Sequence, residues 1–308
     1  MTTELYPPLS ICEIGQRQNQ EDTIGQWNNR LFVLCDGMGG YEKGEVASQT
    51  VCQSLVRWFA EHLSPEAVFT DNQLCDALAY AYAELDQCAD DSSRQMGTTL
   101  TLLYLHRRGA TAAHIGDSRI YHIRPGVGFL YQSRDHSLVF DLFRAGEITY
   151  QEMLSHPKKN IITRAMSPGA DNRVRPDIVH ITDIRAGDYF YLCSDGMMER
   201  MDHTSLFRTL AALTTDEEKR RQLITATADN QDNHSAWIIR VKEVSHDEKD
   251  SLLADEEATA PCNALRFMPW VNERIDDDDV TIVQEGKKSR TLWQRLKALF
   301  GFSTNKNK

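Results

Sequence analysis

The stretch that decides the fold is "TTLTLLYLHRRGATAAHIGDSRIYHIRPG", residues 98–126. Its β-branched and aromatic residues fall into three short runs separated by turn residues, which predicts three consecutive strands: Thr98–His106, Ala110–Ile115 and Arg119–Ile123. Two long helical patterns precede it, Ala47 to His62 and Leu74 to Cys88, with apolar residues three and four positions apart. Paired helices followed by consecutive strands do not repeat the alternation of a parallel sheet. They favour antiparallel hairpins packed against helices.

Other runs of the same kind predict further strands at Leu9–Ile14, Leu31–Cys35, Asp188–Cys193 and Ala236–Val241. With 308 residues, 41% of them hydrophobic, the chain can fill a sizeable core. The N-terminal "MTTELYPPLS" has no basic segment leading into an apolar one, so we expect a cytoplasmic protein. Seven scattered cysteines without a CxxC pair indicate reduced thiols rather than disulfides or zinc ligands.

The charge of the chain, −11 in total, is unevenly spread. Residues 243–285 hold 13 Asp/Glu against 3 Lys/Arg, whereas residues 286–308 hold 7 Lys/Arg and no acid. We therefore expect a folded domain over residues 1–242, an acidic flexible linker over 243–285 and a basic amphipathic helical tail over 286–308. The tail has an apolar face made up of Leu292, Trp293, Leu296, Leu299 and Phe300. This face could bind a partner, a membrane surface or the domain itself. An acidic body is repelled by a phosphate backbone, which argues against nucleic acid as a partner.

Aspartates stand where several of the predicted strands end or begin. They occur in "ICEIGQRQNQED", "LFVLCDG", "AAHIGDSR", "YLCSDGMME" and "NQDNHSAWIIRV", as Asp22, Asp36, Asp117, Asp195 and Asp232. One Asp-Gly pair is typical of a turn. Five converging carboxylates, however, repel one another unless a cation lies among them.

Hard divalent cations suit such a set of oxygen ligands. Mg²⁺ and Mn²⁺ bind carboxylates and carbonyls and keep several waters, so histidine or cysteine ligands are not required. The glycine that follows Asp36 lets the backbone approach an ion closely. Two ions about 3.5–4 Å apart would share a water and direct it at phosphorus. The pattern therefore predicts a phosphoester hydrolase.

Nine motifs, in this order between residues 9 and 242, resemble those of the metal-dependent protein phosphatase family, the type 2C serine/threonine phosphatases, in a bacterial version. They are "RQNQEDTIG", "VLCDGMGG", "GEVAS", "GTTL", "HIGDSRIYHI", "RDHSLV", "NIITRAM", "GDYFYLCSDGM" and "DNHSAWIIRV". The resemblance implies an α+β fold, a four-layer αββα sandwich of two mostly antiparallel sheets flanked by helices. It also implies hydrolysis of phosphoserine and phosphothreonine by a water that bridges two Mn²⁺ or Mg²⁺ ions, with a third ion in bacterial relatives.

The resemblance also implies the roles of individual residues. The metal ligands would be Asp22, Asp36, Gly37, Asp117, Asp195 and Asp232. Asp36 would bridge both catalytic ions, Asp22 would act with Glu21 through bound water, and Asp117 would support the third ion. Arg17 would hold the substrate phosphate by a two-pronged contact that suits a guanidinium.

Several of these roles have alternatives. Arg17 could be a surface arginine, and Asp117 could cap the turn that follows it. His136 in "RDHS" is interpreted as a local hydrogen-bonding residue at the start of a helix, outside the catalytic set. Asp278 or Asp279 in "IDDDDVTIV" could replace Asp232, although the spacing of 37 residues from Asp195 favours Asp232.

Met38 stands where eukaryotic relatives have a histidine that protonates the leaving oxygen. A thioether has no proton to give, so metal-bound water or solvent would supply it. The expected partners are phosphorylated proteins, with a serine/threonine kinase and its substrates as the usual bacterial setting, and we expect a monomer. The competing hypothesis is a catalytically weak or silent phosphatase-fold module that regulates or scaffolds through its C-terminal tail.

Overall fold

The computed structural model describes residues 2–39, 43–64, 69–89, 96–169 and 173–245. Residues 246–308, which include most of the predicted linker, the whole predicted tail and both Asp278 and Asp279, lie outside the described residues. The chain divides into two compact units, Met1–Ser137 with Ile162–Val271 and Leu138–Ile161 with Asn272–Lys308. Both sheets belong to the first unit.

The described strands form two antiparallel sheets. Their bounds are β1 Thr2–Leu5, β2 Leu9–Glu13, β3 Asp22–Trp27, β4 Leu31–Met38, β5 Gly97–Thr98, β6 Leu100–His106, β7 Gly109–Ile115, β8 Arg119–Arg124, β9 Gly128–Gln132, β10 Asp177–Ile181, β11 Tyr189–Cys193 and β12 His234–Ser245. The first sheet has the order β1-β12-β11-β8-β9, with β2 also on β12. The second has the order β10-β7-β6-β4-β3, with β5 also on β4.

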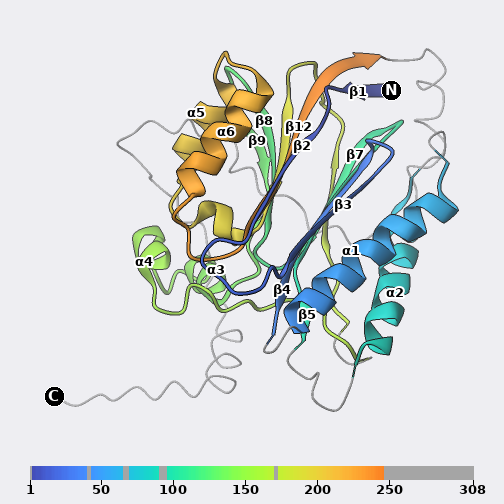
Figure 1. The fold of residues 1–308 in the computed structure, drawn as a ribbon, viewed down its shortest axis with the longest axis vertical. Coiled ribbons are helices and arrows are strands. Elements are labelled where there is room, and N and C mark those ends of the chain that lie inside the picture. Colours follow the sequence, from blue (N-terminus) through green and yellow to red (C-terminus); the bar gives the residue numbers. More distant parts are fainter. Residues whose placement is uncertain (1, 40–42, 65–68, 90–95, 170–172, 246–308) are drawn as a thin grey trace. The chain divides into compact units, whose positions relative to one another are not determined.

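Helices cover the outer face of each sheet. In the first unit they are α1 Lys43–His62, α2 Asp71–Gln87, α5 His203–Ala211 and α6 Asp216–Thr227. Figure 1 shows α1 and α2 beside the second sheet, and α5 and α6 beside the first. Three buried apolar clusters fill the spaces between these four layers. The four-layer αββα prediction is confirmed.

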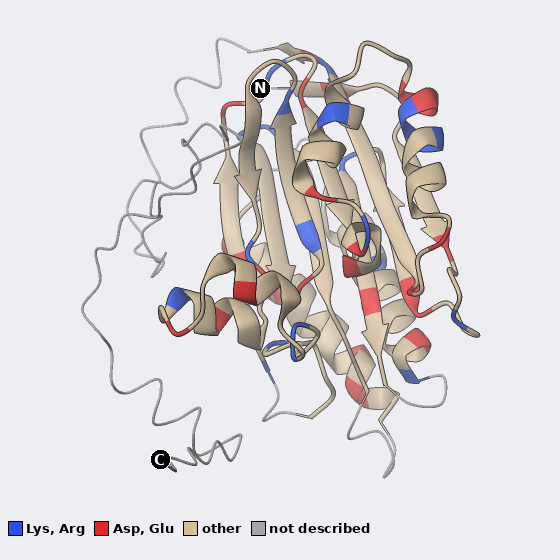
Figure 2. Cartoon of the chain, turned by 90° about the vertical axis from the view of Figure 1, so that its left-hand side faces the viewer, with Lys and Arg blue, Asp and Glu red and all other residues tan. Residues whose placement is uncertain are grey.

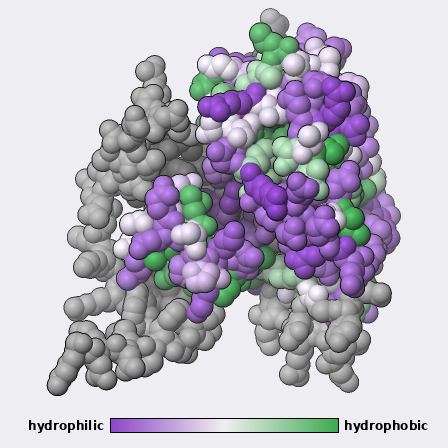
Figure 3. Space-filling model, turned by 60° about the vertical axis from the view of Figure 1, so that its left-hand side comes forward, coloured by the Kyte–Doolittle hydropathy of each residue, from purple (hydrophilic) through white to green (hydrophobic). Residues whose placement is uncertain are grey.

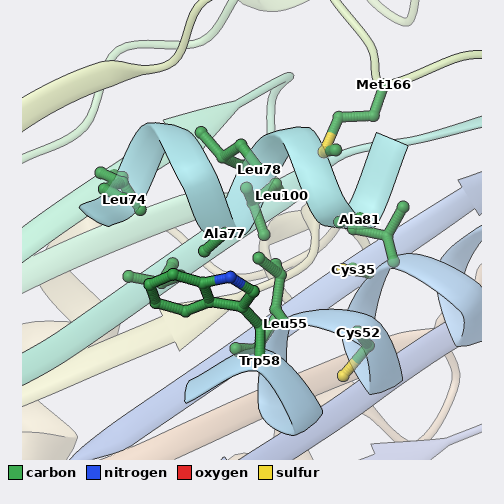
Figure 4. Packing of buried hydrophobic residues seen from close by; sticks show 14 of the residues in the cluster. Cys35, Cys52, Leu55, Trp58, Leu74, Ala77, Leu78, Ala81, Leu100 and Met166 are labelled. Atoms are coloured by element: carbon green, nitrogen blue, oxygen red, sulfur yellow. The ribbon is translucent and has the colours of Figure 1, made fainter. Parts of the chain in front are cut away.

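The helical periodicity of α1 explains how it packs. Val51, Leu55 and Trp58 recur at three- and four-residue spacing and are buried in the cluster under α1. Leu55 and Trp58 are shown in Figure 4. Leu74 and Leu78 of α2 face them from the neighbouring helix. Each fully buried aliphatic side chain of this size contributes about 1.5–3 kcal/mol to stability. The α1–α2 layer is therefore a firm support for β4.

Strand β4 is apolar along its whole first half because both of its faces are buried. Leu31, Val33 and Cys35 belong to the cluster under α1, whereas Phe32 and Leu34 belong to the cluster between the sheets. Across that inner cluster the Trp237 indole N–H of β12 donates to the Val33 carbonyl at 3.0 Å. The two sheets are thus joined directly at the strand that carries Asp36.

Strands β1, β3, β9 and β10 were not predicted, and two further differences from the sequence predictions bear on the site. Strand β4 runs on to Met38 instead of ending at Cys35, because Gly37 and Met38 pair with β5. Strands β7 and β8 do not form a hairpin, since they belong to different sheets. The hairpins of this region are β6–β7 and β8–β9. The crossing between sheets at residues 116–118 is what brings Asp117 to the end of the sandwich.

The described part of the second unit consists of two short helices, α3 Leu138–Arg144 and α4 Tyr150–Ser155. A capping box begins α4: the Thr149 side chain accepts from the Glu152 N–H, and the Glu152 carboxylate accepts from the Thr149 N–H. Among all described helices, none is both long and apolar enough to cross a membrane.

Candidate metal centre

The five predicted aspartates lie where strands of both sheets end or begin. Asp22 and Asp36 are directly opposite each other on β3 and β4. Asp117 lies between β7 and β8, Asp195 follows β11, and Asp232 precedes β12. Strands are largely uncharged along their length (tan in Figure 2), and charged residues gather at strand ends and on helices. Antiparallel pairing places these strand ends at the same end of the sandwich.

The electrostatics of these carboxylates are unfavourable in the protein alone. Burial raises the pKa of Asp22 to about 7, even though Ser194 donates a 2.8 Å hydrogen bond to its Oδ2. Burial, and then the negative charges of Asp22 and Asp195, raise the pKa of Asp36 well above its usual range. Burial and Asp195 do the same to the pKa of Asp117. Such a set is stable in its ionised form only with positive charge supplied among the carboxylates.

Two buried carboxylate oxygens have no hydrogen-bond partner among the described residues, Asp22 Oδ1 and Asp117 Oδ1. A buried oxygen left unpaired is costly, and a cation or its bound water would satisfy it. The donors are oxygens only, which fits Mg²⁺ or Mn²⁺. Among the described residues, no three of these aspartates bring carboxylate oxygens to within 4.8 Å of one another. They therefore suit ions that keep several waters in their shell.

Arg17 and Asp232 are paired with each other. The Arg17 Nε and Nη2 atoms donate to the two Asp232 carboxylate oxygens, each at 2.8 Å. Both side chains are partly exposed, 55% and 39%. The predicted phosphate anchor and the predicted ligand thus meet at the edge of the site. A cation on Asp232 would compete with the guanidinium, whose fork would then be available to a phosphate.

The comparisons with known proteins identify the family. The model of the protein phosphatase 2C family matches residues 13–229. The chain belongs to this family. It is 36% identical over 199 residues to protein phosphatase PhpP of Streptococcus pneumoniae serotype 2, an alignment that covers 61% of this chain and 77% of PhpP.

Solved structures of protein phosphatase 2C relatives share the fold. The serine/threonine phosphatase PstP/Ppp of Mycobacterium tuberculosis has a TM-score of 0.69 at 28% identity, covering 78% of this chain and 100% of that one. The catalytic domain of PstP in complex with two manganese ions has a TM-score of 0.65 at 28% identity, covering 78% and 99%. The cofactor prediction, Mn²⁺ or Mg²⁺, is confirmed for the family.

Gly37 is needed in this phosphatase domain for close packing. A Cβ atom there would lie 2.0 Å from the Gly44 carbonyl oxygen of α1 and 2.8 Å from that of Glu21. The Gly37 N–H donates to the Glu21 carbonyl at 3.0 Å. The glycine therefore lets the end of β4, the first turn of α1 and Glu21 come together beside Asp36.

Sequence reasoning missed three residues that hold the aspartates or the loop beside them. Ser194 binds Asp22 as described, and the Thr99 hydroxyl accepts the Asp36 N–H at 3.0 Å. The Asn233 amide accepts from the Glu21 N–H at 2.8 Å and donates to the carbonyls of Ile14 and Asn19. Asn233 therefore holds the loop that carries Arg17. All three residues stand within motifs already quoted, "SDG", "GTTL" and "DNHS", beside or near the acids.

Proposed function

We propose that the chain is a metal-dependent protein serine/threonine phosphatase that hydrolyses phosphoserine and phosphothreonine by direct attack of water. The observation that carries this proposal is the meeting of aspartates at strand ends, two of which, Asp22 and Asp117, are buried with a carboxylate oxygen that has no hydrogen-bond partner among the described residues. Membership of the protein phosphatase 2C family supports it. When bound, two Mn²⁺ or Mg²⁺ ions would lower the pKa of a shared water and orient it towards phosphorus.

The residues that would hold the two catalytic ions are those at the strand ends. Asp36 would bridge them, the Gly37 carbonyl would bind one, and Asp195 and Asp232 would bind the other. Asp22 would act through water, with its Oδ2 fixed by the Ser194 hydroxyl. Asp117 would bind a further ion.

Arg17 would bind two oxygens of the substrate phosphate, and no side chain of this set would form a covalent phosphoenzyme. Cys35 and Cys193 are fully buried. Burial raises the pKa of Cys193 to about 12, so a thiolate nucleophile is not favoured there. Met38, which is partly buried at the end of β4, has no proton for the leaving oxygen. Water would supply that proton.

Turnover of a phosphothreonine peptide tests this function. We expect hydrolysis with Mn²⁺ or Mg²⁺, its loss on addition of a chelator, and its loss in Asp232→Ala. Full activity of Asp232→Ala would move the ligand role to another acid, such as Asp278 or Asp279. Metal-dependent turnover absent from both the full chain and a chain ending near Glu243 would contradict the enzyme function and favour a silent regulatory module.

We further propose that the protein acts in the cytoplasm as a monomer on phosphorylated proteins, in a pathway with a serine/threonine kinase. In support, the face drawn in Figure 3 is mostly hydrophilic, with apolar side chains in small scattered patches. The proposed organisation is a phosphatase domain over 1–242, a linker over 243–285 and a basic tail over 286–308. Sedimentation with anionic vesicles, compared between the full chain and one ending near Glu243, tests membrane contact by the tail.

A further inference from the structure

The turn that carries Asp117 is held from both sides by two consecutive residues, Asp135 and His136. On one side, the His136 N–H donates to the Gly116 carbonyl at 2.9 Å, and the Gly116 N–H donates to His136 Nδ1 at 3.1 Å. On the other side, Arg119 donates a two-pronged pair of hydrogen bonds to Asp135, at 2.8 and 2.6 Å. The path of the backbone through Asp117 is therefore set by residues that are not themselves proposed ligands.

Gly116 cannot hold this turn by itself. Its φ is +101°, a conformation that only glycine adopts readily, and a Cβ atom there would lie 2.6 Å from the Thr99 side chain. A glycine in such a position is free to move unless its polar groups are bound. Both of them are bound by His136, whose side chain is only 7% exposed.

The other nitrogen of the His136 ring, Nε2, faces a carboxylate. His136 Nε2 lies 3.4 Å from Asp177 Oδ2, and Asp177 Oδ1 accepts from Arg164 at 3.0 Å. Arg164 Nη1 also lies 3.3 Å from Nε2. Because Nδ1 accepts the Gly116 N–H, the ring proton is on Nε2 and faces the Asp177 carboxylate, and Arg164 therefore donates to Asp177 and not to the ring. A carboxylate behind a histidine sets both the tautomer and the ring orientation.

The same cluster is not arranged as a second metal site, although ligand atoms of His114, His136 and Asp177 lie within 4.8 Å of one another. The two imidazole rings are stacked, with centroids 4.6 Å apart and planes 13° apart, so their lone pairs do not converge on one ion. Nδ1 of His136 is occupied by the Gly116 N–H. The guanidinium of Arg164 already occupies Asp177. The cluster therefore acts through hydrogen bonds.

We propose that His136 is a positioning residue of the metal centre: by accepting the Gly116 N–H at Nδ1, it aims the Asp117 carboxylate at its ion. The inference rests on the proposed function only in that Asp117 is taken as a metal ligand. Residues behind a ligand typically change metal affinity by 10–100-fold when altered. The loss of this hydrogen bond should therefore lower the affinity for the metal ion, with only a small effect on the stability of the metal-free fold.

Two substitutions separate the two edges of the ring. His136→Asn keeps an acceptor at the place of Nδ1 and loses the contact with Asp177, whereas His136→Gln keeps a donor near the place of Nε2 and loses the acceptor. The readouts are the half-activating Mn²⁺ concentration for phosphopeptide turnover and the Mn²⁺ midpoint of the rise in Tm. For His136→Gln we expect about a tenfold increase in both. For His136→Asn we expect values within about twofold of the wild type.

His122→Gln is the matched control, since His122, further along β8, is another buried histidine beside an aspartate, with its Nε2 2.8 Å from Asp188 Oδ2. It should lower Tm and leave both Mn²⁺ midpoints unchanged. In an Asp117→Asn background, His136→Gln should add no further shift. Equal midpoints for His136→Asn and His136→Gln, or a full additional shift in that background, would overturn the inference. If there were no turnover, but the Mn²⁺ midpoint of the rise in Tm still differed between His136→Asn and His136→Gln, the proposed function would be wrong and this inference would stand.

Discussion

The two ends of β11 carry acids in opposite electrostatic situations. Asp188, just before the strand, is fully buried, and Arg124 and His122 donate to its carboxylate at 2.8–2.9 Å. Burial raises the pKa of Asp188, but these hydrogen bonds outweigh it and lower the pKa to about 2. Just beyond the other end of the strand, burial and the charge of Asp232 raise the pKa of Asp195. One chain thus contains an acid with its counter-charges and an acid without them.

The difference separates a structural acid from a functional one. A buried carboxylate that only supports the fold needs its positive partners in the sequence, because an unpaired buried charge is strongly destabilising. A carboxylate that binds a cation must leave its oxygens available, and the protein bears the cost of repulsion until the ion arrives. Asp22 follows the second pattern, because the side chain seen to hold it, Ser194, donates from a neutral hydroxyl.

The largest expected effect is at Asp36. Asp36→Asn should lower kcat/KM with Mn²⁺ by about a thousandfold or more, which corresponds to about 4 kcal/mol of transition-state stabilisation. In the presence of a chelator its Tm should equal or exceed that of the wild type, because a negative charge is removed from beside Asp22 and Asp195. More than a tenth of the wild-type activity, or a marked loss of metal-free stability, would contradict the functional assignment of this acid.

The matched change at the other end of the strand should have the reverse result. Asp188→Asn removes the charge that compensates Arg124 and an acceptor for the His122 N–H, and should lower the free energy of unfolding by about 3–5 kcal/mol. Activity per folded molecule, measured well below the lowered Tm, should stay within about twofold of the wild type, because no proposed site residue is touched. The comparison fails if Asp188→Asn changes the Mn²⁺ dependence of turnover.

The pH dependence of stability provides a smaller effect of known sign. The folded pKa of Asp188 is about 2, below the value near 3.9 of an unfolded aspartate. Its contribution is therefore complete above about pH 4 and is lost as the pH falls towards 2, by about 2 kcal/mol. Urea unfolding at pH 5 and pH 2 should show a decrease in stability that is smaller by this amount in Asp188→Asn. An equal decrease in both proteins would mean that Asp188 is not ion-paired in the folded state.

How far the sequence predicts the fold depends on burial. Strand β4 and helices α1 and α2 were predictable because their apolar residues face buried layers on one or both sides. Strand β3, "DTIGQW", was not predicted, since most of it is only partly buried. Its Gly25 lies where a Cβ atom would meet Cys52 and Val56 of α1 at 2.7 and 2.9 Å. A glycine required by a helix 27 residues further along the chain leaves no periodic signal.

The candidate site divides in the same way. The positions of the aspartates follow from strand ends and from ordered motifs, so the sequence locates all five. The pairing of Arg17 with Asp232 joins residues 215 apart. The two hydrogen bonds between Gly116 and His136 depend on the path of the chain after β9. His136 was left out of the catalytic set, and the structure places it behind the Asp117 turn, a role that only the three-dimensional contact reveals.

The smallest expected effect concerns the neutral donor at the metal centre. Ser194→Ala removes the hydroxyl that donates to Asp22 and accepts the Ser235 N–H at 3.0 Å. The loss of one such hydrogen bond is worth about 1 kcal/mol, which corresponds to about a fivefold higher half-activating Mn²⁺ concentration. Thr227→Val, which removes another buried hydroxyl within α6, should cost similar stability and leave the Mn²⁺ dependence unchanged. An unchanged half-activating Mn²⁺ concentration in both variants would contradict this role. The Ser194 hydroxyl would then only support the backbone of β12, and Ser194 would be a structural residue like Asp188.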